Sequence, residues 1–498
     1  MGREVPVWGL VVAQGAISAA SLVVEIVAGR MLAPHVGMSL YTWTSVIAVV
    51  LAGFSAGHWW GGRLAELSPA ASLRWTGGAL IAAGATTAGA VLLLPLVAGP
   101  VLAALVNPVA AMTALTALVF FAPSFFAGVP APVLTRIAVL RADRTGPALG
   151  AMFASGAVGA IAGTLLAGFV FIAWLGSART LVLVTVVYLV TGALFLWSGR
   201  AARRWLAALA IGAVLLLAGA ALAAPAQCHR ESRYFCLRTE DLSADPARPV
   251  RLMVIDHLAH GIAARDLPGV QFTEHAAMLE TLTVARAPGP EFTSFHIGGG
   301  TFAVPRALAA RGIGGITVAE IDPEVTALAV ADFWFDPDSA TVLHEDARRA
   351  LLTRPETRYD VIVGDAFTDV VVPVHLVTRE FFALVASRLT PDGSFLMNVV
   401  DHEDRLGALA SIVATLGEVF PSVEVWTQAA QPLPGQRMVF VVAAGQGPTP
   451  VDSFSVPAPD LTRFGALSDG MVAALVAERG LVLTDDYAPI DRLMGRQD

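Results

Sequence analysis

The feature that most constrains the fold of this chain is a series of apolar runs that recur before Pro225. Each run is about 20 residues long, the length that a helix needs to cross a hydrocarbon core of about 30 Å. Charged residues make up 14% of the chain, whereas a soluble protein carries roughly a quarter. We therefore predict that residues 1–225 form a multi-pass α-helical membrane domain in a lipid bilayer.

Hydropathy predicts seven spans in this domain. The first run lacks the small-residue cleavage site of a signal peptide and is followed by other spans, so it should remain as a helix. The predicted spans are Val7–Val27, Tyr41–Trp60, Trp75–Val97, Val109–Gly128, Leu149–Leu175, Thr180–Trp197 and Trp205–Ala224.

The arginines between the spans predict the orientation. Nine arginines lie at the amino terminus or in the even-numbered loops, and only Arg30 and Arg179 lie in the odd-numbered loops. Because cytoplasmic loops carry the excess of basic residues, we expect a multi-pass protein of the cell inner membrane with a cytoplasmic amino terminus. Seven spans would place everything after Ala224 on the outer, periplasmic or extracellular face, whereas six or eight would return it to the cytoplasm.

The only two cysteines, Cys228 and Cys236, follow the last predicted span. A disulfide between them would fit an oxidising compartment, which agrees with the outer location. The alternative is a pair of unpaired thiols in a strand-rich segment.

One ionisable residue, Glu25, lies inside a predicted span. A charge there is costly unless it is paired or faces a cavity. Glu25 therefore marks either a structural pair, with Arg30 as the nearest partner, or a pathway.

For the rest of the chain the sequence predicts a soluble α/β region. We expect residues 226–290 to form a small β region with a linking helix, and residues 291–498 to form a Rossmann-like domain. Segments such as "FTSFHIGGG", "FAVPRALAARG" and "GITVAEID" alternate between strand and helix patterns. This alternation predicts a parallel sheet with helices on both faces and a ligand at the carboxyl ends of its strands. The net charge of -8 argues against a nucleic-acid partner.

Polar or glycine residues end four successive predicted strands. Gly298 to Gly300 end the first, where backbone can approach a ligand closely. Glu320 ends the second, a position from which a carboxylate can accept both hydroxyls of a ribose. Asp346 and Asp365 end the third and fourth. The glycine run lacks the full G-x-G-x-x-G pattern, and a second strand that ends in a carboxylate is available to bind an adenine. This order therefore favours an S-adenosylmethionine-type site over an NAD site.

From Tyr234 to Leu493 the chain resembles the spermidine synthase family of aminopropyltransferases, in particular its membrane-fused bacterial branch. The motifs that carry the resemblance are "HIGGGTFAVPRAL", "VAEIDPEV", "HEDARRAL", "YDVIVGDAFTD", "VPVHLVTREFF" and "LTDDYAPIDRL". The resemblance implies an S-adenosylmethionine-dependent transferase fold. It also implies that a putrescine-like amine attacks decarboxylated S-adenosylmethionine and releases methylthioadenosine, with Asp365 holding the amine and taking its proton. No metal is expected, because the sulfonium is already an activated leaving group.

We expect two further sets of site residues. The cofactor-binding set is Gly298, Gly299, Gly300, Thr301, Glu320, Asp346 and Ala347. The substrate-binding set is Asp369, His257, His260, Glu274, Asp485, Asp486 and Tyr487. For the second set a structural role remains open, as exposed polar side chains or as a helix cap.

The sequence departs from the family where the amine should bind. Thr301 stands where the family usually has an Asp, and "QFTEHAAMLE" stands in place of D-E-x-x-Y-H-E-M-L, which leaves His275 at the Tyr position. Asp365 and Asp369 are one residue further apart than is usual in the family. Two alternatives therefore remain: a methyltransferase that uses S-adenosylmethionine, and a transporter or sensor with a non-catalytic nucleoside- or polyamine-binding domain. The oligomeric state is open, and a homo-oligomer is one option.

Overall fold

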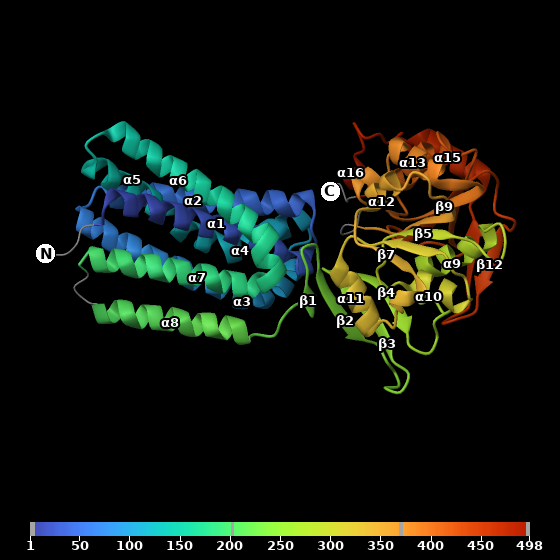
Figure 1. The fold of residues 1–498 in the computed structure, drawn as a ribbon, viewed down its shortest axis with the longest axis horizontal. Coiled ribbons are helices and arrows are strands. Elements are labelled where there is room, and N and C mark those ends of the chain that lie inside the picture. The colour runs from blue at the N-terminus through green and yellow to red at the C-terminus, as the bar shows by residue number, and fades with distance from the viewer. Residues whose placement is uncertain (1–4, 201–203, 368–371, 495–498) are drawn as a thin grey trace. The chain divides into compact units, whose positions relative to one another are not determined.

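Figure 1 shows the protein as a computed structural model that describes residues 5–200, 204–367 and 372–494. The chain divides into two compact units, Met1–Cys236 and Leu237–Asp498. The first unit is helical and the second is α/β. The predicted order of a multi-helix apolar region followed by a Rossmann-like α/β region is confirmed.

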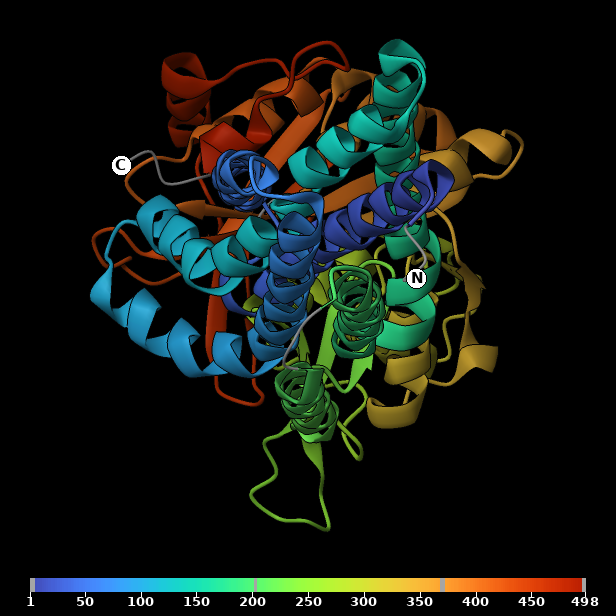
Figure 2. The same cartoon turned by 90° about the vertical axis from the view of Figure 1, so that its left-hand side faces the viewer.

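The first unit is built from long apolar helices. They are α1 (Val7–Val36), α2 (Leu40–Ala65), α3 (Pro69–Ala104), α4 (Pro108–Gly128), α5 (Pro130–Arg141), α6 (Thr145–Leu166), η1 (Ala167–Phe171), α7 (Ile172–Ser198) and α8 (Arg204–Ala223). α1 contacts α2, α4, α5, α6 and α7, and Figure 2 shows this bundle from the helix ends. Since α4 joins α5, and α6 joins α7 through the π-helix η1, the described residues form six helices that are long and apolar enough to cross a membrane.

The expectation of seven separate helices is corrected in one place. The fifth and sixth predicted spans lie in a single segment of 54 residues, Thr145–Ser198. Gly176 interrupts this segment with φ 74° and ψ 172°, a conformation that glycine adopts readily because it lacks a Cβ.

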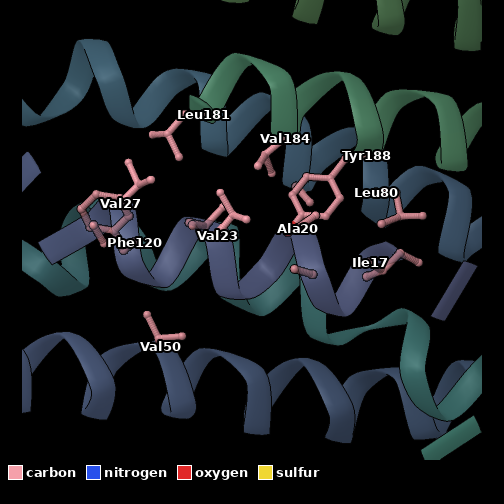
Figure 3. Close-up of a cluster of buried hydrophobic side chains, with 14 of the residues drawn as sticks. Ile17, Ala20, Val23, Val27, Val50, Leu80, Phe120, Leu181, Val184 and Tyr188 are labelled. Atoms are coloured by element: carbon pink, nitrogen blue, oxygen red, sulfur yellow. The ribbon is translucent and has the colours of Figure 1, made fainter. Parts of the chain in front are cut away.

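The chain reverses direction inside this segment. α6 runs parallel to α1, because Gly159 packs against Gly15 and Gly163 packs against Ala19. α7 runs antiparallel to α1: Figure 3 shows Leu181, Val184 and Tyr188 beside Val27, Val23 and Ala20, in reverse order. The 54-residue segment therefore passes through the bundle twice, and the directions alternate as seven spans require. Which end faces the cytoplasm stays a prediction.

Glycines set the distance between the paired helices. A Cβ added to Gly159 of α6 would lie 2.1 Å from the carbonyl oxygen of Gly15 in α1. A Cβ added to Gly57 of α2 would lie 2.1 Å from the carbonyl oxygen of Phe125 in α4. Small residues at such contacts allow helix backbones to approach closely in the absence of a hydrophobic driving force.

Gly159→Leu should therefore destabilise the bundle by about 1–3 kcal/mol or more, because backbone cannot yield as a flexible side chain would. We expect a lower midpoint of thermal unfolding of the full chain in detergent. Gly150→Leu is the matched control, since Gly150 lies on the same helix and a Cβ added to it would have no atom within 4 Å. Equal midpoints for the two variants would contradict the close α1–α6 contact.

Most of the exposed tryptophans gather at one end of the bundle, whereas Trp174, at the start of α7, lies at the other. Trp8 begins α1, Trp59 and Trp60 lie near the end of α2, and Trp75 lies near the start of α3. At the same end, Trp197 closes α7 and Trp205 opens α8. Such a belt is typical of the membrane–water interface, where an indole can be both apolar and hydrogen-bonded.

The segment after α8 is fixed to the helices by polar contacts. Glu231 of β1 (Arg230–Glu231) accepts hydrogen bonds from the Ser177 amide, at 2.9 Å, and from the Ser177 hydroxyl, directly after the break at Gly176. Arg30 donates to the carbonyl oxygens of Tyr234 and Ser232. The predicted disulfide between Cys228 and Cys236 is present and closes this segment into a loop.

The expected structural pair between Glu25 and Arg30 is absent. Arg30 is buried and its guanidinium is used by the two carbonyl oxygens. Those oxygens belong to a loop that is remote from α1 in sequence, so proximity along the helix did not determine the partner.

The second unit begins with a small antiparallel sheet. β2 (Cys236–Asp241) pairs with β3 (Val250–Ile255), which pairs with β4 (Leu258–Ala264). The helix α9 (Glu274–Arg286) follows, with its apolar positions buried.

Among the described residues the main sheet has nine strands, in the order β12-β13-β10-β11-β9-β8-β5-β6-β7. Its parallel strands are β5 (Ser294–Ile297), β6 (Ile316–Ala319), β7 (Thr341–Leu343), β8 (Tyr359–Gly364) and β9 (Leu389–His402). The antiparallel strands are β10 (Ser422–Gln428), β11 (Arg437–Gly445), β12 (Ser453–Val456) and β13 (Thr462–Ala466). The predicted parallel sheet is thus half of a mixed sheet.

Helices and short 3₁₀ turns connect these strands. They are α10 (Ala303–Ala310), α11 (Pro323–Asp332), η2 (Pro337–Ser339), α12 (Ala347–Thr353), η3 (Val374–Leu376), α13 (Arg379–Arg388), α14 (Gly407–Gly417), α15 (Asp469–Arg479) and α16 (Ile490–Met494). β5 lies between β6 and β8, so the strand order reverses there. In such sheets the crevice for a ligand lies at this switch point, at the carboxyl ends of the strands.

Candidate active site

The glycine turn after β5 lies against the end of β8. Gly298 has φ +92°, and a Cβ added to it would lie 2.4 Å from the carbonyl oxygen of Asp365. Gly300 also has a positive φ, of +52°. Only glycine combines this backbone conformation with so close an approach, and the turn therefore brings the predicted cofactor loop and the predicted catalytic residue together.

Glu320, at the end of β6, holds the glycine turn in place. Its carboxylate accepts hydrogen bonds from the Gly299 amide at 2.8 Å and from the Asp322 amide at 2.9 Å. Burial raises the pKa of this carboxyl group, although the backbone donors favour its ionised form.

The Asp365 carboxylate follows β8 and is held by the neighbouring strand. Asn398 of β9 donates a hydrogen bond of 2.8 Å from Nδ2 to Oδ1 of Asp365. Nε2 of His275, on α9, lies 3.9 Å from Oδ2. The side chain of Asp365 is 31% exposed, so it remains accessible from the crevice.

Two more histidines extend this group, since His260 interacts with Asp365 and His257 interacts with His260. His260 of β4 interacts electrostatically with Asp365, His275 and His257, and its burial lowers its pKa to about 4. Burial also lowers the pKa of His257, which follows β3, and the charge of Arg437 acts in the same direction. At neutral pH both imidazoles are therefore uncharged and can accept hydrogen bonds from an amine. His257 and His260 are both partly buried, and their role at the site stays a prediction.

Asp346 lies in a second polar group. It is the N-cap of α12 and accepts from the Arg349 amide at 2.9 Å, while Nε2 of His375 lies 2.7 Å from its other oxygen. The hydrogen bond with His375 is the main cause that lowers the pKa of Asp346. Ala347 is buried as the first residue of α12.

Asp485 joins this second group rather than the histidines. Arg348 donates to both of its oxygens, at 2.7 and 2.6 Å, and the Thr378 hydroxyl donates at 2.7 Å. These contacts, chiefly those of Arg348, lower the pKa of Asp485 to about 2. The Arg348 guanidinium also donates to the carbonyl oxygen of His375, which links Asp485 to the loop that holds Asp346.

The other predicted site residues belong to neither of these two polar groups. Thr301 is buried, and its side chain packs against Gly261 of β4. Glu274 is exposed in the first turn of α9, and Asp486 and Tyr487 are exposed near the carboxyl terminus. Asp369 lies outside the described residues.

Two residues of the Asp365 group were not predicted to act at the site. His275 stands at a departure from the family motif, and Asn398 lies inside a predicted strand. Asn398 is a polar residue in the otherwise apolar run "FLMNVV", which is the one signal that could have drawn attention to it.

The buried histidines of the α/β unit predict a loss of stability in mild acid. Burial lowers the pKa of His296, in β5, to about 3, so the folded protein leaves it neutral where the unfolded chain takes up a proton near pH 6.5. Stability is therefore full above about pH 6.5 and falls as the pH drops, by about 1.4 kcal/mol per pH unit for each such histidine.

We expect His296→Asn to flatten this dependence by about 2 kcal/mol between about pH 6.5 and about pH 5, relative to the parent protein. The measurement is chemical denaturation of the full chain in detergent at several pH values. The raised pKa of Glu320 acts in the opposite direction but is common to both proteins. Parallel stability curves for the two proteins would refute the neutral buried state of His296.

The chain matches no protein-family model. Over 133 residues it is 32% identical to a probable polyamine aminopropyl transferase of Bifidobacterium longum, an alignment that covers 26% of this chain and 29% of the relative. Further relatives are also polyamine aminopropyltransferases. The chain is therefore similar to polyamine aminopropyltransferases over part of its length.

Two further matches are to an enzyme of another name and to a solved structure. Over 172 residues the chain is 33% identical to an N-terminal histidine N-methyltransferase of Emericella nidulans, which covers 33% of this chain and 30% of the relative. A solved structure of a probable spermidine synthase from Corynebacterium glutamicum is similar with a TM-score of 0.43 and 20% identity, over 52% of this chain and 96% of that one. The chain spans less than a third of the Bifidobacterium and Emericella relatives.

Proposed function

We propose that this chain is an integral-membrane aminopropyltransferase that transfers an aminopropyl group from decarboxylated S-adenosylmethionine to an amine and releases methylthioadenosine. The observation that carries the proposal is the position of the Asp365 carboxylate. It lies against the glycine turn, is held by Asn398, lies 3.9 Å from Nε2 of His275 and interacts electrostatically with His260.

The reaction needs a neutral amine beside an electrophilic carbon. The lone pair of the amine nitrogen forms a bond to the aminopropyl carbon, the carbon–sulfur bond breaks, and its electrons neutralise the sulfonium. Asp365 attracts the protonated amine and takes the proton that the nitrogen loses. Asn398 fixes the orientation of the carboxylate, so that reacting groups meet in one geometry.

The remaining roles follow from the same arrangement. Gly298 to Gly300 and Thr301 would line the methionine-derived part of the co-substrate. Glu320 would hold the ribose, and Asp346 with Ala347 would adjoin the adenine. His257, His260 and Glu274 would line the acceptor pocket with Asp369, and Asp485, Asp486 and Tyr487 would close the crevice. The contacts of Asp485 with Arg348 support a closing role more than direct binding of the amine.

Product identification tests the proposal. The purified full chain in detergent is incubated with a mixture of amines and either decarboxylated S-adenosylmethionine or S-adenosylmethionine, and the nucleoside product is identified by mass spectrometry. Methylthioadenosine, formed only from the decarboxylated compound, is expected. S-adenosylhomocysteine would instead establish a methyltransferase, and binding without turnover would establish a sensor or transporter.

We propose further that the α/β domain lies on the outer face of the inner membrane. The Cys228–Cys236 disulfide and the alternating helix directions support this location.

In cells that express the full chain, we expect both cysteines to resist a maleimide reagent until a reductant is added. A shift in electrophoretic mobility measures this, and a Cys228→Ser, Cys236→Ser variant provides the unlabelled control. Labelling without reductant in freshly lysed cells would place the loop in a reducing compartment.

A further inference from the structure

A polar stripe runs along the central helix α1. Gln14, Ser18, Ser21 and Glu25 are spaced by four, three and four residues, which places all of them on one face of the helix. The Gln14 amide donates to the Ser18 hydroxyl at 3.2 Å, and the Ser21 hydroxyl lies 3.2 Å from that of Tyr188 in α7. Gly156 of α6 packs beside Gln14 and Ser18, so this part of the stripe faces α6 and α7.

Both ends of the stripe hold acceptors without partners among the described residues. Gln14 is 8% exposed, and its Oε1 atom is buried and forms no hydrogen bond. The Glu25 carboxylate is half-buried in the span and forms no hydrogen bond or ion pair with any described residue. A buried acceptor without a partner and an ionisable group inside a span are both costly, so these two positions call for a ligand.

The neighbouring helix is distorted where it follows α6 along α1. Gly159 lies beside Gly15 and Gly163 beside Ala19. Ala167 is the first residue of the π-helix η1, which contacts α1. π-Helical turns are rare and are frequent at functional sites.

We propose that this stripe, Gln14, Ser18, Ser21 and Glu25 with Tyr188, binds a linear polyamine in protonated form, with Glu25 as its counter-ion and Gln14 Oε1 as a distal acceptor. Gln14 and Glu25 are separated by about 16 Å along the helix, from the rise of about 1.5 Å per residue. A metal cation needs about six oxygen ligands around one point, whereas this stripe offers one polar side chain per turn. A linear molecule with N–H donors at intervals matches such a row. This site goes beyond the transfer reaction and does not depend on it.

Binding of radiolabelled spermidine to the full chain in detergent, measured by equilibrium dialysis, tests this site. We expect two molecules per chain in the parent protein. Glu25→Gln should weaken one site by about 10-fold or more, the usual effect of losing a hydrogen bond to a charged group. Glu66→Gln, which removes a carboxylate that is 77% exposed at the end of α2, should bind as the parent does.

Asp365→Asn separates this site from the proposed active site. If the aminopropyl transfer is right, Asp365→Asn weakens the other site; if it is wrong, Asp365→Asn has no effect while Glu25→Gln still weakens one. Unchanged binding by Glu25→Gln would overturn the membrane site.

A second measurement uses the parent protein, in case Glu25→Gln does not fold. Dicyclohexylcarbodiimide modifies carboxyl groups in apolar surroundings, and the modified peptide can be identified by mass spectrometry. We expect Glu25 to be modified and spermidine to protect it. Modification that depends on pH but not on spermidine would identify a proton site instead, and would overturn the proposal.

Discussion

Asp365→Asn is expected to lower kcat for aminopropyl transfer by about 100- to 10,000-fold, the range that a positioned general base contributes. The change keeps the shape of the side chain but removes the charge that attracts the amine and the group that takes its proton. Steady-state formation of methylthioadenosine, measured at saturating amine, provides kcat, and its dependence on amine concentration provides KM.

Asp392→Asn is the matched control for this variant, because Asp392 is an exposed carboxylate in β9 and undergoes the same isosteric change. Its activity should stay close to that of the parent. If Asp365→Asn kept its kcat within about threefold, the proton would have to leave by another route, and the proposed base would be wrong.

Gly298→Ala should also abolish activity, but through the fold. The added methyl group would lie 2.4 Å from the carbonyl oxygen of Asp365, and the backbone would keep a φ of +92° that other residues avoid. The conformational strain and the overpacking together should cost about 2–5 kcal/mol. We expect a matching loss of unfolding free energy for the α/β domain in denaturant titrations of the full chain.

Gly312→Ala separates the two causes, because Gly312 has a similar φ of +80° with no atom within 4 Å of the added Cβ. Gly312→Ala should lower the unfolding free energy only by the conformational strain and not by the overpacking. Equal losses for the two variants would show that the contact between the glycine turn and Asp365 adds nothing to stability.

The part of the site that lies at strand ends could be predicted from the sequence. Gly298, Glu320 and Asp365 each end a strand of a parallel run, and parallel strands bring their carboxyl ends to one edge. The residues that reach this edge from elsewhere could not be placed in the same way. His275 comes from a helix and Asn398 from the middle of β9, so their proximity to Asp365 depends on packing and on strand register.

Prediction from the sequence has the same limit for the membrane helices. Hydropathy identified all the apolar segments, since length and composition determine whether a helix can cross a bilayer. It could not show that Gly176 joins two of them in one segment, nor that Arg30 would bind carbonyl oxygens after α8 instead of Glu25. The antiparallel strands β10 to β13 were also missed, because the strand and helix alternation that identified the parallel half ends before them.

The closed loop between Cys228 and Cys236 indicates where the chain can be divided. By its contacts with Arg30 and Ser177 the loop belongs with the helices, although its sequence is strand-like and looked continuous with the β region. A domain exchange with a soluble relative should therefore join the two parts at Leu237. A junction at residue 226 would carry the cysteines away from the helices and leave Arg30 and Ser177 without their partners.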